Sequence, residues 1–180
     1  MLLDGREGVA KDWNGAFELA EEGARLGCHH CQGVMAECYM GVHGCVRNAA
    51  RSLELARESS GKGSRYGQRT LGQYYEGRCD YAQAVALYRL AAAQNFDGAQ
   101  FSLGIMYYYG GGVARDYAEA LRLFQLAAAQ GHPDALHMVA FCHENGLGVP
   151  KNKAEAIHWY RRAQAAGSTH AADALQRLRA

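Results

Sequence analysis

Proline is nearly absent from this sequence, since its 180 residues include only Pro133 and Pro150. Valine and isoleucine are also scarce, whereas alanine and glycine are abundant. Because β-branched residues favour strands and proline interrupts helices, this balance predicts helices with close backbone contacts. With 49% apolar residues, the chain can bury the core of one sizeable domain or of a short repeat array.

The chain also lacks an excess of either charge. Its formal net charge is +1, from 19 Lys and Arg against 18 Asp and Glu, and no run of like charges occurs. We therefore expect no nucleic-acid partner and no membrane surface bound by charge alone. No stretch approaches the about 20 apolar residues of a membrane-spanning helix, so we expect no membrane insertion.

The first residues, "MLLDGREGVAKD", have neither the basic nor the apolar region of a signal peptide. A trimmed secreted protein would lack them as well. The composition, rich in Ala, Arg and Gly, suggests a bacterial origin. The compartment, periplasm or cytoplasm, and the oligomeric state stay open.

Catalytic motifs are missing too. There is no G-x-S-x-G, no Walker A sequence and no H-E-x-x-H. The "HENG" at 143–146 is interpreted as a helix end, and the "GGGV" at 110–113 as a turn, because similar loops recur elsewhere. We expect no catalytic residues and no cofactor.

What is present is an internal repeat anchored on an Asp or Asn. Successive anchors lie 36, 32, 36 and 36 residues apart. Counted from the anchor, the residues at offsets 4, 11 and 19 have small side chains and those at offset 7 have large ones. The residue at offset 15 is Gly or Asn. Columns restricted in this way indicate a structural repeat. The anchors are Asp12, Asn48, Asp80, Asp116 and Asn152.

Each column suits one part of a helical hairpin. The anchor suits a helix N-cap, whose side chain accepts hydrogen bonds from the first turn. The Gly or Asn at offset 15 suits a left-handed residue that ends this helix. A second helix is expected to start near offset 19, with a glycine-rich loop leading to the next anchor. We call the anchor-led helix helix B and the other helix A.

A single A–B pair cannot bury its apolar faces, so the repeats should stack. We predict an all-α fold, a right-handed α-solenoid (α/α superhelix) of antiparallel helix pairs. We expect one domain over 1–180, with a partial repeat at about 1–27, repeats at 28–63, 64–95, 96–131 and 132–167, and a capping helix at 168–180. The first repeat lacks most of helix A, so we expect upstream sequence or a rearranged cap.

Residues 99–132 and 146–167 resemble the Sel1-like repeat, a relative of the tetratricopeptide repeat. Trp159 and Tyr160 stand at the family's aromatic pair. The 64–95 repeat has lost four loop residues, and the 28–63 repeat is weak, with Ser59 and Ser60 replacing an Ala pair. The resemblance implies a binding scaffold; some bacterial members are immunity proteins that block a toxic effector. It is carried by Ala99, Leu103, Gly104, Tyr107, Gly110, Gly112, Val113, Asp116, Ala120, Ala127, Ala128 and Gly131.

The "CHHC" at 28–31 looks reactive, but its cysteines occupy repeat columns. Cys31 falls in the small column at offset 19 and Cys28 in the turn between repeats. We favour packing, because a free cysteine behaves as a small apolar residue. A metal-binding or redox-sensing module at 28–45, with Cys28, Cys31, His43 and Cys45 as ligands, is an alternative. A Cys45–Cys79 disulfide between successive loops is another.

The face of each A helix opposite its core stripe is the candidate binding surface. A rotation of about 100° per residue places Phe101, Ile105 and Tyr108 opposite Ala99 and Leu103. We predict that a partner protein or peptide binds there, unless curvature buries these residues against neighbouring A helices. In tetratricopeptide-like solenoids this face is concave. The predicted contacts are Arg69, Gln73, Glu76, Phe101, Ile105, Tyr108, His137, Phe141 and Glu144.

The sequence therefore favours a non-catalytic protein-binding scaffold, acting as an adaptor, a regulator or an immunity protein. Two alternatives stand beside it. One is the metal or redox module at 28–45. The other is a hydrolase, because some cysteine-rich relatives have been credited with β-lactam binding; however, no nucleophile–base pair supports it here.

Overall fold

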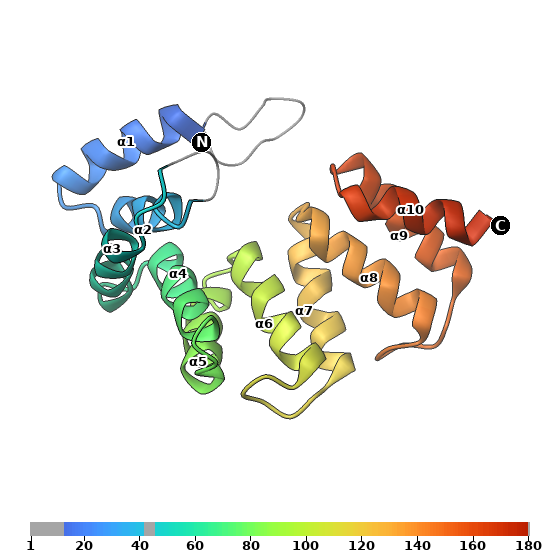
Figure 1. The fold of residues 1–180 in the computed structure, drawn as a ribbon. Coiled ribbons are helices and arrows are strands. Elements are labelled where there is room, and N and C mark those ends of the chain that lie inside the picture. The colour runs from blue at the N-terminus through green and yellow to red at the C-terminus, as the bar shows by residue number, and fades with distance from the viewer. Residues whose placement is uncertain (1–12, 42–45, 180) are drawn as a thin grey trace. The chain divides into compact units, whose positions relative to one another are not determined.

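The computed structural model describes residues 13–41 and 46–179 (Figure 1). This part of the chain forms ten α-helices and no strand, so the predicted all-α fold of antiparallel helix pairs is confirmed. None of these helices is long and apolar enough to cross a membrane. The helices are α1 Trp13–Arg25, α2 His29–Cys38, α3 Ala49–Gly61, α4 Arg65–Glu76, α5 Tyr81–Ala92, α6 Asp97–Tyr109, α7 Tyr117–Ala129, α8 Pro133–Asn145, α9 Lys153–Ala165 and α10 Thr169–Arg179.

The chain divides into two compact units, an N-terminal unit over Met1–Ala91 and a C-terminal unit over Ala92–Ala180. In the N-terminal unit, α2 packs against α1, α3 and α4. In the C-terminal unit, each helix from α6 to α10 packs against the next one along the chain (Figure 1). Each unit has its own apolar core.

The B helices α3, α5, α7 and α9 begin directly after an anchor residue, as predicted. Asp116 Oδ1 accepts hydrogen bonds from the backbone nitrogens of Ala118 and Glu119 at 2.9 and 3.0 Å. Asn152 binds the first turn of α9 in the same way, and Asn48 and Asp80 each accept one such bond. Asp12 lies outside the described residues.

The residue predicted to end each B helix adopts the left-handed conformation in all five repeats. Its φ angle is 85° at Gly27, 84° at Gly63, 55° at Asn95, 85° at Gly131 and 89° at Gly167. Glycine reaches this region without a Cβ clash, and asparagine tolerates it better than most residues. The same offset therefore carries a left-handed residue after helix B in every repeat.

The A helices begin two residues earlier than predicted, and in three of them the side chain of the turn residue caps the helix. The side chains of Cys28, Ser64 and His132 accept a hydrogen bond from the backbone nitrogen three residues later, at 3.4, 3.4 and 3.3 Å. A cap fixes the helix start at the following residue. This places the first turn at offset 17 rather than near offset 19.

The small columns at offsets 11 and 19 face each other across the A–B contact. A Cβ added to Gly23 would overlap Cys31 Sγ, and one added to Gly67 would overlap Ser59 Oγ. Within the C-terminal unit, Ala127 with Ala135 and Ala163 with Ala171 occupy these offsets, and all four alanines are fully buried. The helices thus approach closely wherever the two side chains together stay small.

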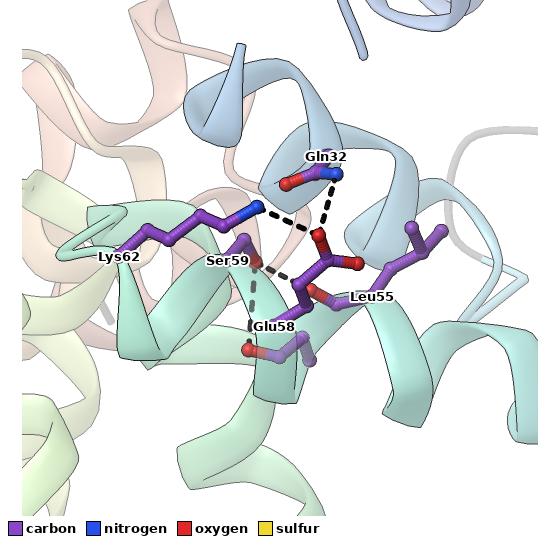
Figure 2. Close-up of polar contacts among 6 residues, drawn as sticks. Gln32, Leu55, Glu58, Ser59 and Lys62 are labelled. Atoms are coloured by element: carbon purple, nitrogen blue, oxygen red, sulfur yellow. Dashed lines mark hydrogen bonds and ion pairs between the residues drawn. The ribbon is translucent and has the colours of Figure 1, made fainter. Parts of the chain in front are cut away.

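Two serines that stand in small columns of the 28–63 repeat, Ser52 and Ser59, are satisfied by hydrogen bonds. Ser59 Oγ donates to the Leu55 carbonyl oxygen at 2.6 Å, one turn back in α3 (Figure 2). Ser52 Oγ donates to the Ala36 carbonyl of α2 at 2.7 Å. Glu58, on the exposed face of α3, accepts from Gln32 of α2 at 3.1 Å (Figure 2). Serine can therefore occupy alanine columns in this repeat without an unpaired hydroxyl.

Large buried residues of helix B stand at both offset 7 and offset 8. Leu55 and Leu123 at offset 7 are buried, as are the aromatic residues at offset 8 of the last three repeats. Tyr88, Phe124 and Tyr160 are fully buried, whereas Leu19 at offset 7 is 61% exposed. A Cβ added to Gly72 would lie 2.6 Å from the Tyr88 ring, and one added to Gly104 would lie 2.6 Å from the Phe124 ring. In these two hairpins the aromatic ring of helix B therefore packs directly against a glycine of helix A.

Candidate functional site

The nine predicted contact residues fall into two sets, one in each compact unit. Arg69, Gln73 and Glu76 lie on α4 of the N-terminal unit. The other six lie on α6 and α8 of the C-terminal unit, and we call them the α6–α8 face. This face consists of Phe101, Ile105, Tyr108, His137, Phe141 and Glu144.

All six residues of the α6–α8 face are half-buried. The sequence predicted that Phe101, Ile105 and Tyr108 point away from the core, but all three pack partly against it. The prediction treated α6 as an isolated cylinder, whereas neighbouring helices cover part of its outer side. Each aromatic ring therefore keeps only part of its surface open.

Ring contacts fix the aromatic side chains of this face. Phe101 stacks on the ring of His132, the cap of α8, with centroids 4.8 Å apart and planes 19° apart. Tyr108 lies 6.5 Å from Phe141 and 5.4 Å from Tyr117, centroid to centroid. Because such pairs prefer defined geometries, the rings are held in place with little conformational freedom.

The other end of the face is polar and internally paired. Glu144 accepts a hydrogen bond from the Tyr160 hydroxyl at 2.8 Å and pairs with Arg177 of α10 at 2.7 Å. Burial and the bond to Glu144 raise the pKa of Tyr160. The ring of His137 lies 5.3 Å from that of Tyr160 and 5.9 Å from that of His170. Burial, and to a smaller extent the neighbouring charge of His170, lowers the pKa of His137. The lowered pKa favours the neutral form of this histidine.

The N-terminal unit repeats one of these polar pairs. The Tyr88 hydroxyl donates to Glu76 at 2.5 Å, and the two residues occupy the same offsets as Tyr160 and Glu144. Arg69 forms an ion pair with Glu37, with both side chains less than one-fifth exposed. Gln73 lines a cavity of about 280 Å³. Arg69, Gln73 and Glu76 are half-buried, so they too are only partly open to solvent.

Both cysteines of "CHHC" make local structural contacts. Cys28 caps α2 and Cys31 packs against Gly23. Nowhere in residues 13–41 and 46–179 do three or more metal-ligand side chains converge. His43 and Cys45, the other two residues of the metal and disulfide alternatives, lie outside these ranges. Cys79 is an exposed free thiol.

The sequence reasoning missed the residues that support the α6–α8 face from behind. His132, Tyr117 and Arg177 each contact one of its members. The aromatic residues at offset 8 of the last three repeats, Tyr88, Phe124 and Tyr160, were the signal for the buried rings. The contacts that His132, Tyr117 and Arg177 make with other helices had no comparable signal in the sequence, because they depend on how neighbouring hairpins pack.

Stacked antiparallel helix pairs, with a capped anchor and facing small columns, define an α-solenoid repeat protein. The sequence pattern of the Sel1 repeat matches residues 1–28, 66–96, 98–132 and 133–168, which together make up well over half of the chain. The chain therefore belongs to the Sel1 repeat family. The unmatched stretch from 29 to 65 is the repeat in which serines replace the alanine pair.

Solved structures share this fold. A protective antigen of uropathogenic Escherichia coli, which displays an SLR fold, matches with a TM-score of 0.73 and 31% identity, over 94% of this chain and 37% of that one. This chain thus spans little more than a third of that protein. A Sel1 repeat protein from Oxalobacter formigenes matches with a TM-score of 0.75 and 24% identity, over 97% of this chain and 71% of that one.

An immunity protein from Pseudomonas aeruginosa also matches, with a TM-score of 0.54 and 13% identity, over 92% of this chain and 78% of that one. At this identity the likeness concerns the fold alone. No curated protein matches this chain. Sel1 repeat proteins are typically non-catalytic scaffolds that mediate protein–protein interactions.

Proposed function

We propose that this chain is a non-catalytic scaffold that binds a partner protein or peptide on the α6–α8 face. The observation that carries the proposal is the set of half-buried aromatic rings, Phe101, Tyr108 and Phe141, held by contacts between α6 and α8. Rings that are fixed in place and partly open resemble the anchors of interface hot spots. Glu144 and His137 supply a polar edge beside them.

The polar edge suits a protein partner better than a highly charged ligand. Arg177 is paired with Glu144, and the His137 pKa is lowered, so this end of the face carries little unbalanced charge. Apolar anchors beside paired polar groups are typical of protein–protein interfaces. In the N-terminal unit, Arg69, Gln73 and Glu76 are the corresponding polar contacts that we propose for α4.

The most specific form of this proposal is an immunity role, in which the partner is a toxic effector from a bacterium. The immunity protein of Pseudomonas aeruginosa supports it only as an example of the same fold in that role. A fold does not choose a function, so the gene neighbourhood is the relevant test. An adjacent toxin gene would favour this form, and an adjacent receptor or envelope gene would favour an adaptor.

Photo-crosslinking tests the location of the site even when the identity of the partner is unknown. We expect benzoylphenylalanine in place of Phe141 to crosslink a defined protein in cells of the source organism. The matched control replaces Leu126 of α7, an apolar residue of the same unit that is 41% exposed. Equal crosslinking of the same protein from both positions, or crosslinking from position 126 alone, would move the site away from the α6–α8 face.

A further inference from the structure

Cys28 and Cys31 place two thiols on the first turn of one helix. Cys28 is the N-cap of α2, with φ −70° and ψ 106°, and its Sγ lies 3.4 Å from the backbone nitrogen of Cys31. Both cysteines are free, and each is half-buried rather than sealed in the core. His29 and His30 separate them, with ring centroids 4.4 Å apart. The pair is thus a C-x-x-C dithiol at a helix N-terminus.

We propose that Cys28 and Cys31 form a thiol–disulfide exchange site, in which Cys28 attacks a low-molecular-weight disulfide and Cys31 resolves the product. The protein-binding function does not use this pair, and the proposal does not depend on that function. It concerns reversible oxidation of the dithiol by a small disulfide.

The backbone around the pair allows the two sulfurs to join. Residues three apart on a helix have Cβ atoms about 5–6 Å apart, somewhat more than the roughly 3.5–4.5 Å of a disulfide. Cys28 stands outside the helix in an extended conformation, so its side chain can turn toward Cys31 without breaking a helical hydrogen bond. At the equivalent of Gly23 the other repeats carry Ser or Ala, and only glycine leaves room for the Cys31 sulfur.

The surroundings divide the roles of the two thiols. A hydrogen bond from the Cys31 thiol, followed by bonds from backbone N–H groups of the first turn, lowers the pKa of Cys28. Burial, followed by the bond to Cys28, raises the pKa of Cys31 to about 11. The thiolate is the nucleophile in exchange, and helix N-termini and C-x-x-C motifs favour it. Cys28 is therefore the attacking thiol and Cys31 keeps its proton until the second step.

The reaction balances with the small disulfide as oxidant. The Cys28 thiolate attacks one sulfur of RS–SR, a Cys28–S–SR bond forms, and RS⁻ leaves and takes up a proton. Cys31 then loses its proton and attacks the Cys28 sulfur, which releases a second RS⁻ that becomes RSH. The protein loses two electrons and two protons, and one disulfide molecule becomes two thiols.

The test uses the reduced chain, glutathione disulfide at neutral pH and a metal chelator. After acid quenching, the remaining thiols are alkylated and the peptides are measured by mass spectrometry. We expect a Cys28–Cys31 disulfide that reduced glutathione reverses, whereas the exposed Cys79 should give only a mixed disulfide. Cys31→Ala should accumulate glutathione on Cys28. Cys28→Ser keeps a capping hydroxyl, as at Ser64, and should slow the reaction at Cys31 at least about tenfold.

Three results would overturn the proposal. One is a parent chain in which Cys28 and Cys31 stay reduced while Cys79 reacts. Another is a Cys28→Ser variant in which Cys31 reacts as fast as Cys28 does in the parent. The third is equal formation of the Cys28–Cys31 disulfide in the urea-unfolded chain, which would show that the first turn of α2 contributes nothing. If a variant fails to fold, the first and third results, which are measured on the parent chain, still test the proposal.

Discussion

At the scale of single residues, the facing columns at offsets 11 and 19 keep a nearly constant combined size. Gly23 faces Cys31, Ser59 faces Gly67, and alanine occupies both columns in the other repeats. Interiors are packed too tightly for either partner to change alone without a void or a clash. Cys31 is therefore not simply a substitute for alanine in its column, because its size is matched to the glycine opposite.

This pairing predicts coupling between the two positions. Cys31→Ala should leave a small void beside Gly23, and Gly23→Ala should clash with the Cys31 sulfur, each lowering the free energy of unfolding by about 1 kcal/mol. The double variant should be at least as stable as the parent, because it restores the alanine pair of other repeats. Urea unfolding of all four chains measures the coupling. Strictly additive losses would show that the two side chains do not meet.

His137 predicts a loss of stability in mild acid. Its pKa is lowered below the ordinary 6.5, so the unfolded chain binds the proton more tightly than the folded chain. The stability that neutral His137 adds to the folded chain is fully present above about pH 6.5. It is lost as the pH falls through the lowered pKa. The charged and titratable groups around it are His170, Asp134, Glu144, Arg177 and Tyr160.

The measurement is the urea midpoint at pH 8 and pH 5, in the parent and in His137→Gln. We expect the variant to lose less stability on acidification than the parent does. The control is His158→Gln, at an exposed position of α9, which should keep the parent's pH dependence. A midpoint difference between pH 8 and pH 5 that is the same in all three chains would contradict the assignment.

At the scale of elements, the helix boundaries follow from caps that the sequence shows directly. The Asp or Asn anchor and the left-handed Gly or Asn could be predicted because each acts through its own local backbone. The start of the A helices was misplaced because cysteine and histidine are unusual caps, although Cys28 and His132 perform this role. Ser64 in the same column was the available clue.

Asp116 tests the role of these caps. Asp116→Ala removes the acceptor for two backbone N–H groups of α7 and should cost about 0.5–2 kcal/mol of stability. Asp116→Asn is the matched control and should stay close to the parent, because Asn152 caps α9 with the same geometry. Thermal unfolding of the three chains distinguishes them. An alanine variant as stable as the asparagine variant would mean that this cap contributes nothing.

The α6–α8 face could be predicted from the sequence only in part. The helical period placed Phe101, Ile105 and Tyr108 together on one side of α6, and Phe141 at the matching position of α8. It could not show that His132 and Tyr117 cover parts of these rings, because those contacts cross from one helix to another. Their half-buried state is thus a property of hairpin stacking, not of any single helix.

At the scale of the whole molecule, each compact unit is a short stack whose helices contact near neighbours. Glu144 shows how one residue can connect three helices, since it lies on α8 and binds Tyr160 of α9 and Arg177 of α10. In repeat proteins, stability is close to a sum of repeat and interface contributions. Surface residues within such a stack can therefore change for binding while the capped and small columns preserve the fold.

The central claim is that a partner protein binds the α6–α8 face, and the affinity of the crosslinked partner for two variants tests it most directly. Phe141→Ala should weaken binding at least about thirtyfold, because truncating a central anchor typically costs 2 kcal/mol or more. Leu126→Ala, at the exposed control position, should bind like the parent, and thermal unfolding should show both variants folded. Unchanged affinity of a folded Phe141→Ala chain, or an equal loss in Leu126→Ala, would contradict the claim.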